Sequence, residues 1–117
     1  MKVYRRGTGE QYTPFDHFGM ETQVIFNPET GSPKANVTLS TFPPGSGSQD
    51  EVHENSDQIF YLIKGRLTFS AKGQVIAELK EGDGLLVPAG EVHAVRNERD
   101  EEGALLAITV PPLPITH

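Results

Sequence analysis

Short runs in which apolar and polar residues alternate make up most of the chain. In residues 35–41, one face of an extended segment carries Ala35, Val37, Leu39 and Thr41, while Asn36, Thr38 and Ser40 lie on the other. The same period of two recurs in residues 67–71 and 75–80, which a Lys72-Gly73 turn separates. No window of 12 residues keeps an apolar stripe of helical period free of turn-forming residues.

These runs predict strands near residues 22–27, 35–41, 58–63, 67–71, 75–80, 85–87, 92–97 and 104–110. Regular short strands separated by turn signals are typical of an all-β sandwich or barrel. Residues 1–20 show no clear pattern.

The predicted strand at residues 58–63 is apolar on both faces. Phe60 and Leu62 share one face, and the other carries Ile59, Tyr61 and Ile63. A strand covered on only one side would alternate more cleanly. We therefore expect the outer face to be covered as well, either by an N-terminal strand or by the second subunit of a homodimer.

Composition narrows the fold further. A length of 117 residues fits one domain, so we expect a single domain over residues 1–117. The 12 Gly and 9 Pro are spread along the chain, as expected for many short strands joined by tight turns. Proline cannot donate to a sheet ladder, so residues 111–117, which begin Pro-Pro-Leu-Pro, are expected to form an extended tail.

Charge and residue counts exclude several functional classes. The chain has no Cys, which excludes disulfides, thiolate metal sites and a cysteine nucleophile. Its formal charge of −6 and the lack of a basic cluster argue against a nucleic-acid partner. The longest mostly apolar run, residues 104–110, is too short to span a bilayer, and the first residues lack the apolar stretch of a signal peptide. We therefore expect a cytoplasmic protein without membrane partners.

Two glycine-bounded blocks carry the residues with chemical potential. The first, over residues 45–65, reads Gly45-x5-Glu51-x-His53-x4-Gln58-x6-Gly65. The second, over residues 82–97, reads Gly82-x5-Pro88-x-Gly90-x2-His93-x3-Asn97. These blocks resemble the two motifs of the cupin superfamily, G-x5-H-x-H-x(3,4)-E-x6-G and G-x5-P-x-G-x2-H-x3-N. The second motif matches at every fixed position, whereas Glu51 replaces the first His of the first motif and Gln58 replaces its Glu.

A different register for the first block is less consistent. Starting it at Gly47 would place His53 at the first His of the motif and Asn55 at the second. Only two residues would then separate Asn55 from Gln58, whereas the motif has three or four at this point. The register from Gly45 matches both flanking glycines and is preferred.

The resemblance implies a small single-domain cupin with a jelly-roll barrel, also called a double-stranded β-helix. It also implies that Glu51, His53, Gln58 and His93 converge on a divalent metal inside the barrel. The residues themselves permit this, because Glu51 and His53 are two apart on one strand and share a face. The turn-prone residues 54–57 can then reset the chain direction before Gln58. Two imidazoles and a carboxylate suit Fe, Mn, Ni or Zn.

Other roles stay open for each of these side chains. His93 can be a packed core residue, His53 and Glu51 solvated surface residues, and Gln58 a structural hydrogen-bonding group. Glu51 can also serve as a catalytic base if it is not a ligand. Asn97 is expected to bond local backbone. His17 and His117 lie outside any spacing pattern and receive no role.

Two functional classes follow. The first is a small metalloenzyme with isomerase or dioxygenase-type chemistry on a small polar or sugar-like substrate. The second is a non-catalytic module that binds a small molecule and holds metal weakly or not at all. Inward positions that would line a substrate cavity or fill a plain core include Phe26, Leu39, Phe60 and Phe69.

Overall fold

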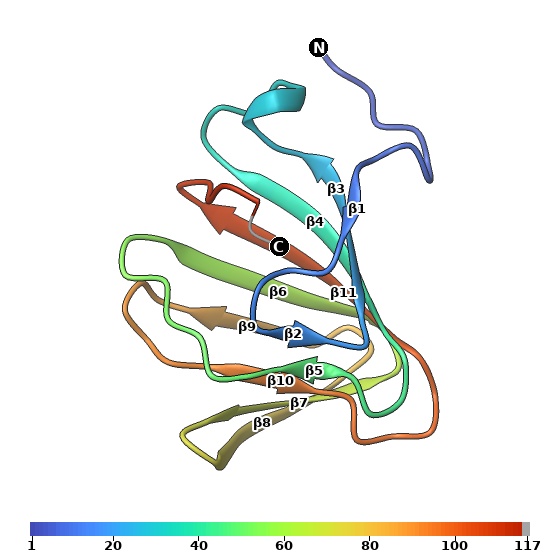
Figure 1. Cartoon of the computed structure of the whole chain (residues 1–117), viewed down its shortest axis with the longest axis vertical. Coiled ribbons are helices and arrows are strands. Elements are labelled where there is room, and N and C mark those ends of the chain that lie inside the picture. The colour runs from blue at the N-terminus through green and yellow to red at the C-terminus, as the bar shows by residue number, and fades with distance from the viewer. Residues whose placement is uncertain (116–117) are drawn as a thin grey trace.

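Two antiparallel β-sheets, facing each other, make up the computed structural model, which describes residues 1–115 (Figure 1). In the first sheet the strands run in the order β1 (Gln11–Tyr12), β3 (Glu21–Phe26), β4 (Asn36–Phe42), β11 (Gly103–Val110), β6 (Asp57–Lys64) and β9 (Gly84–Val87). In the second the order is β2 (His17–Phe18), β5 (Gly47–Ser48), β10 (Ala94–Arg96), β7 (Arg66–Ala71) and β8 (Gln74–Lys80). A 3-10 turn, η1 (Pro28–Thr30), follows β3. The all-β jelly-roll prediction is confirmed.

The longer strands begin and end close to where the alternating pattern places them. Gly73 and Lys72 both have positive φ in the tight β7–β8 turn, as the Lys72-Gly73 signal predicts. At Gly65, between β6 and β7, φ is +79° and an added Cβ would lie 2.7 Å from the carbonyl oxygen of Glu102. Only glycine fits there without a shift of backbone. The two-residue strands β1, β2 and β5 are too short to produce a periodic signal.

The inner face of β4 is polar, contrary to what its pattern suggests. Asn36, Thr38 and Ser40 line the cavity between the sheets, whereas Leu39 lies on the opposite face of the same strand. Phe26 also lies away from this cavity. The expectation that Leu39 and Phe26 point inward is therefore wrong, and the expectation for Phe60 and Phe69, which line the cavity, is confirmed.

The interior changes from polar to apolar along the strands of the first sheet. At one end Asn36, Thr109 and Gln58 are neighbours across β4, β11 and β6. Toward the other end the inward positions become apolar and fully buried, with Phe42 on β4 and Leu62 on β6. The apolar core fills that end of the barrel and extends to the cavity wall. It consists of Met20, Phe42, Phe60, Leu62, Leu67, Phe69, Leu79, Val87, Val95, Leu105 and Ala107.

Asn97, the last residue of the second block, ties a loop to the core. It is completely buried, and its Nδ2 donates to the carbonyl oxygens of Phe42 and Glu101 at 2.8 and 2.7 Å. Its Oδ1 accepts from the N–H of Arg99. The prediction that Asn97 bonds backbone groups is confirmed.

The outer face of β6 is not covered by the N-terminal strand. Ile59, Tyr61 and Ile63 are 46%, 49% and 47% exposed. β1 pairs instead with β3, at the edge of the sheet farthest from β9. The N-terminal-strand alternative is therefore wrong. Within residues 1–115, no helix is long and apolar enough to cross a bilayer.

The homodimer alternative stays a prediction. Leu86 on β9 lies opposite Ile59 and is 59% exposed, so the apolar face continues onto a second strand. Because faces of this kind are typical of contact surfaces, we expect light scattering at micromolar concentration to give twice the chain mass. Tyr61→Lys should shift the mass toward one chain. Ile76→Lys, at an exposed apolar position of β8 in the other sheet, should not. A monomer for the unmodified chain would contradict this prediction.

Candidate metal centre

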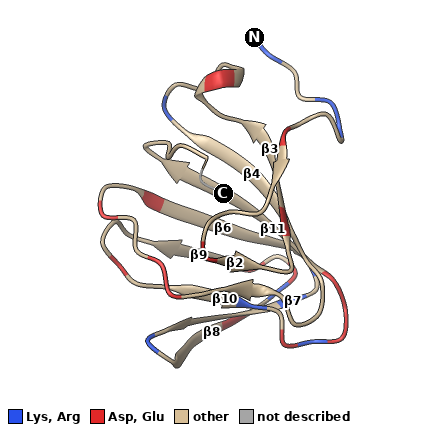
Figure 2. Ribbon diagram, in the orientation of Figure 1, with Lys and Arg blue, Asp and Glu red and all other residues tan. Residues whose placement is uncertain are grey.

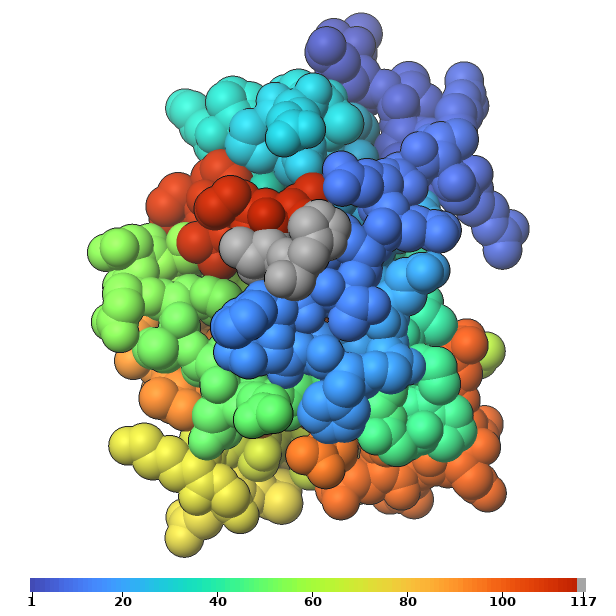
Figure 3. Space-filling view, in the orientation of Figure 1, coloured from blue at the N-terminus to red at the C-terminus, as the bar shows by residue number. Residues whose placement is uncertain are grey.

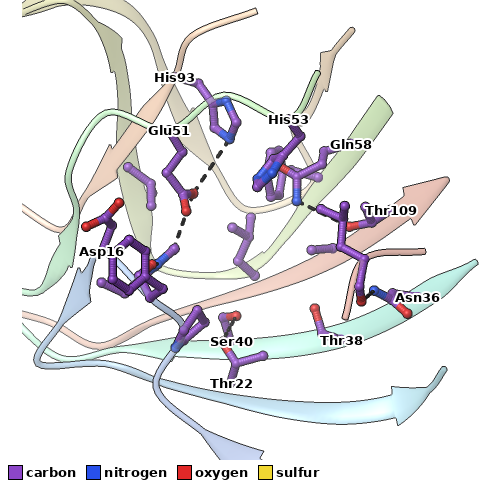
Figure 4. Close-up of a pocket in the computed structure, with 18 of the residues that line it drawn as sticks. Asp16, Thr22, Asn36, Thr38, Ser40, Glu51, His53, Gln58, His93 and Thr109 are labelled. Carbon is purple, nitrogen blue, oxygen red and sulfur yellow. Dashed lines mark hydrogen bonds and ion pairs between the residues drawn. The ribbon is translucent and has the colours of Figure 1, made fainter. Parts of the chain in front are cut away.

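A cavity of about 420 Å³ lies between the two sheets, and the side chains from its two walls differ in chemistry (Figure 4). Residues on or next to strands of the second sheet supply Glu51, His53 and His93. The first sheet supplies hydroxyl and amide side chains, namely Thr22, Asn36, Thr38, Ser40, Gln58 and Thr109. A volume of this size suits a small-molecule ligand.

Backbone pairing places Glu51 directly opposite His93. The N–H of Glu51 donates to the carbonyl of His93 at 2.8 Å, and the N–H of His93 donates to the carbonyl of Glu51 at 2.9 Å. Side chains of residues paired in this way project to the same side. Their side chains meet in the cavity, where Glu51 Oε1 lies 3.9 Å from His93 Nε2.

His53 joins the same cluster from two residues along the chain. Its ring centroid lies 5.6 Å from that of His93. Its carbonyl accepts a hydrogen bond from the N–H of Gly90, which holds the first block against the Pro88–Gly90 turn of the second. The prediction that Glu51 and His53 project together is confirmed by their shared cavity.

The potential ligand atoms of Glu51, His53 and His93 lie within 4.8 Å of one another. Two ligand atoms bound about 2.1 Å from a tetrahedral ion lie about 3.4 Å apart, so side-chain adjustments of about an ångström would bring this set around an ion. The donor types, two imidazole nitrogens and one carboxylate, are those of divalent transition-metal sites. The residues present therefore fit a metal.

His93 is oriented as a metal-binding histidine would be. Its Nδ1 lies 3.2 Å from the carbonyl oxygen of Glu91. A carbonyl only accepts, so Nδ1 carries the proton and Nε2 presents its lone pair to the cavity. Nε2 is buried and has no hydrogen-bond partner among the described residues. An unpaired buried acceptor is costly, and an ion or ligand in the cavity would satisfy it.

Gln58 lines the same cavity at the start of β6. The chain turns at Glu54 and Asn55, as the sequence predicts, and Figure 4 shows Gln58 beside His53. Its Nε2 donates to Thr109 Oγ1 at 3.2 Å, which leaves Oε1 buried without a partner among the described residues. The free amide oxygen is available to a ligand or an ion.

Sequence reasoning missed one histidine of this cavity. His17 lies on β2, which pairs with β5, and its Nε2 is 3.7 Å from Glu51 Oε1. Its Nδ1 is 2.9 Å from the carbonyl oxygen of Phe15. A two-residue strand far from both blocks gives no spacing signal, so only the tertiary structure reveals this position. His117 lies outside the described residues.

Burial governs protonation in the cavity. It raises the pKa of the Glu51 carboxyl to about 7, with a further contribution from Asp16. Burial also lowers the pKa values of His17, His53 and His93, and His93 lowers those of the other two. These directions favour a protonated carboxyl and neutral imidazoles. The contacts of Glu51 with the two histidines therefore have ion-pair distances but gain little from charge attraction in the ion-free protein.

The influence of Asp16 on Glu51 can be tested directly. Asp16 has a φ of +62°, a conformation that Asn also tolerates, so Asp16→Asn keeps the turn and removes the charge. We expect the pKa of Glu51 to fall from about 7 but to stay above 4.5, because burial is the larger cause. Carbon-13 NMR titration of the Glu51 carboxyl measures it. Asp50→Asn, at another acid of the cavity lining, is the control and should leave the value unchanged.

The family model for a cupin domain, Cupin_2, matches residues 38–109. The chain is 27% identical over 97 residues to the polyketide synthase CurC of Streptomyces cyaneus, covering 82% of this chain and 62% of that protein. It is 40% identical over 60 residues to the quercetin 2,3-dioxygenase of Bacillus subtilis (strain 168), covering 51% of this chain and 18% of that protein. It therefore spans less than two thirds of either curated relative.

A solved structure has the same fold. The polyketide cyclase RemF of Streptomyces resistomycificus superposes with a TM-score of 0.82 at 16% identity, over 100% of this chain and 84% of that one.

Proposed function

The chain belongs to the cupin-domain family Cupin_2, and from this premise we propose that it is a divalent-metal-dependent enzyme acting on a small hydroxylated molecule. The observation that carries the proposal is the buried Nε2 of His93, which has no hydrogen-bond partner among residues 1–115 and faces the Glu51 carboxylate at 3.9 Å. Glu51, His53 and His93 would hold the ion, with the Gln58 amide oxygen as a weaker ligand. Fe, Mn, Ni and Zn all suit these donors.

A divalent ion held there would supply Lewis-acid polarisation of a substrate oxygen for isomerisation. If the ion were iron, the same donor set with open positions would suit oxygen activation. The protein's own contribution is to bind and orient the substrate against that position. Asn36 donates its Nδ2 to the carbonyl of Leu113. Its Oδ1 and the Oε1 of Gln58 are buried, and neither has a partner in the described part of the chain. Both oxygens accept hydrogen bonds, so they favour a ligand that carries hydroxyl donors.

The charges around the cavity favour an uncharged substrate. The lining includes the three acids Asp16, Asp50 and Glu51 and, among the described residues, neither Lys nor Arg. Figure 2 shows several of the Lys and Arg residues in the N-terminal segment and in peripheral loops. The two positive charges of an ion are opposed by three carboxylates, so an anionic substrate would meet no net positive site. We therefore favour neutral sugars, polyols or hydroxylated aromatic compounds over sugar acids and sugar phosphates.

Metal analysis tests the metal part of the proposal. Protein purified without chelator, or refilled with Fe²⁺, Mn²⁺, Ni²⁺ or Zn²⁺ and desalted, is expected to retain about one equivalent of at least one of these ions. Less than a tenth of an equivalent with all four would overturn the proposal and favour a non-catalytic binding module.

Substrate class is tested with the metal-loaded protein. Ligand-detected NMR against matched neutral and acidic pairs, such as glucose with glucuronate, should show binding of the neutral member only. Quercetin joins the panel because a relative is named for it. Turnover is then sought for each binder, aerobically for oxygenation and anaerobically for isomerisation. Preferential binding of the acids would refute the uncharged substrate class.

A further inference from the structure

We propose that His17 is an additional protein ligand of the metal, supplied by the N-terminal strand β2. This inference rests on the metal site of the proposed function and extends it to a residue outside the family-matched segment 38–109. The N-terminal segment, blue in Figure 3, lies across the centre of the visible face, and its residues Pro14 and Phe15 line the cavity. His17 would thus bring a third imidazole to a site in which Glu51 stands at the position of a family histidine.

The distance from Glu51 to His17 is close to its distance to His93. Its Nε2 lies 3.7 Å from Glu51 Oε1, and the Nε2 of His93 lies 3.9 Å from the same oxygen. Figure 4 shows two dashed lines meeting at Glu51, one of them from His93. The two imidazole side chains are 12% and 8% exposed. One carboxylate oxygen therefore contacts two buried imidazole nitrogens. The ligand atoms of Glu51, His53 and His93 already lie within 4.8 Å of one another, and His17, which lies outside that group, would join them through a side-chain adjustment around Glu51.

The two histidines are also held in the same way. The Nδ1 of His17 lies 2.9 Å from the carbonyl oxygen two residues earlier, at Phe15. The Nδ1 of His93 lies 3.2 Å from the carbonyl oxygen two residues earlier, at Glu91. Since each carbonyl takes the Nδ1 proton, both rings turn an unprotonated Nε2 toward Glu51. A metal-binding histidine typically donates the N–H of its other ring nitrogen to a carbonyl or a similar acceptor outside the site.

The turn before His17 places this side chain. The N–H of His17 donates to the carbonyl of Pro14 at 3.1 Å, and Asp16 within the turn has a φ of +62°. Left-handed backbone at a residue other than glycine carries a conformational cost. The turn leads directly into β2, where His17 pairs with Ser48 and Phe18 with Gly47. The pairing fixes which of the two side chains enters the cavity, and Phe18 instead packs under the guanidinium of Arg96.

Nitrogen-15 NMR of the full chain, labelled at its histidine rings and titrated with Zn²⁺, tests the proposal. On binding, the Nε2 signals of His17, His53 and His93 are all expected to shift. An Nε2 signal of His17 that stays in place while those of His53 and His93 move would overturn it. The ring signals are assigned by through-bond NMR correlations in the unmodified chain, so this measurement requires no variant.

Affinity gives the second readout. We expect His17→Gln to weaken Zn²⁺ binding by about 10- to 100-fold in a chelator competition titration. Phe18→Leu, on the same strand but directed away from the cavity, should bind within twofold of the unmodified chain. Equal affinity of His17→Gln and the unmodified chain would overturn the role of His17 alone. Failure of the unmodified chain to bind any of the four metals would instead overturn the proposed function itself.

Discussion

His93→Ala is expected to lower the affinity for Zn²⁺ or Mn²⁺ by at least about 100-fold. Loss of a group that merely orients a ligand costs 10- to 100-fold in metal affinity, so loss of the ligand nitrogen itself should reach or exceed the upper value. The Nε2 of His93 is buried and faces Glu51, so no other described side chain can take its place without moving. Competition with a chromophoric chelator measures the loss.

The fold should survive His93→Ala, because the change also removes a buried polar atom that lacks a partner among the described residues. The matched control is Val92→Ala, at the adjacent residue, whose side chain does not line the cavity. It should bind metal as tightly as the unmodified chain. Undiminished affinity in His93→Ala would exclude His93 as a ligand.

Glu51→Gln should make the stability of the metal-free protein less sensitive to pH. Burial raises the pKa of the Glu51 carboxyl to about 7 in the folded protein, against 4.5 for the solvated group. Because the pKa is raised on folding, the free energy of unfolding falls as pH rises through the range from about 4.5 to about 7. Between pH 5 and pH 8 this loss amounts to about 2 to 3 kcal/mol.

Gln cannot ionise, so it removes this loss. The variant should therefore gain about 2 to 3 kcal/mol relative to the unmodified protein between pH 5 and pH 8. Urea unfolding of both proteins with chelator present measures the difference, and the histidines, common to both, cancel to first order. Glu98→Gln, in an exposed loop, is the control and should show no such gain. A parallel pH dependence in the unmodified protein and Glu51→Gln would contradict the raised pKa.

Alternation along the chain was enough to predict the long strands, because a half-buried strand must separate its two faces. The paired blocks also identified Glu51, His53, Gln58 and His93, which the structure brings to one cavity. The local geometry behind this, residues two apart on one strand and a turn before Gln58, is visible in sequence.

Three features depend on tertiary structure and escaped prediction. β4 presents Asn36, Thr38 and Ser40 inward because the barrel encloses a polar cavity at that end rather than a continuous apolar core. The assumption that apolar faces point inward fails there. His17 reaches the cavity through a two-residue strand, and the exposed face around Tyr61 shows that an apolar pattern does not reveal what covers it.

The polar-to-apolar gradient inside the barrel separates the determinants of specificity from those of folding. Side chains such as Asn36, Thr38 and Thr109 contact the cavity, while the deepest packing away from it lies at Leu62 and Leu67. Random replacement at the three polar positions should therefore yield mostly folded proteins, because little packing is lost there. Related barrels can therefore change the ligand that they bind at small cost in folding stability. A laboratory library restricted to these three positions should likewise contain mostly folded variants.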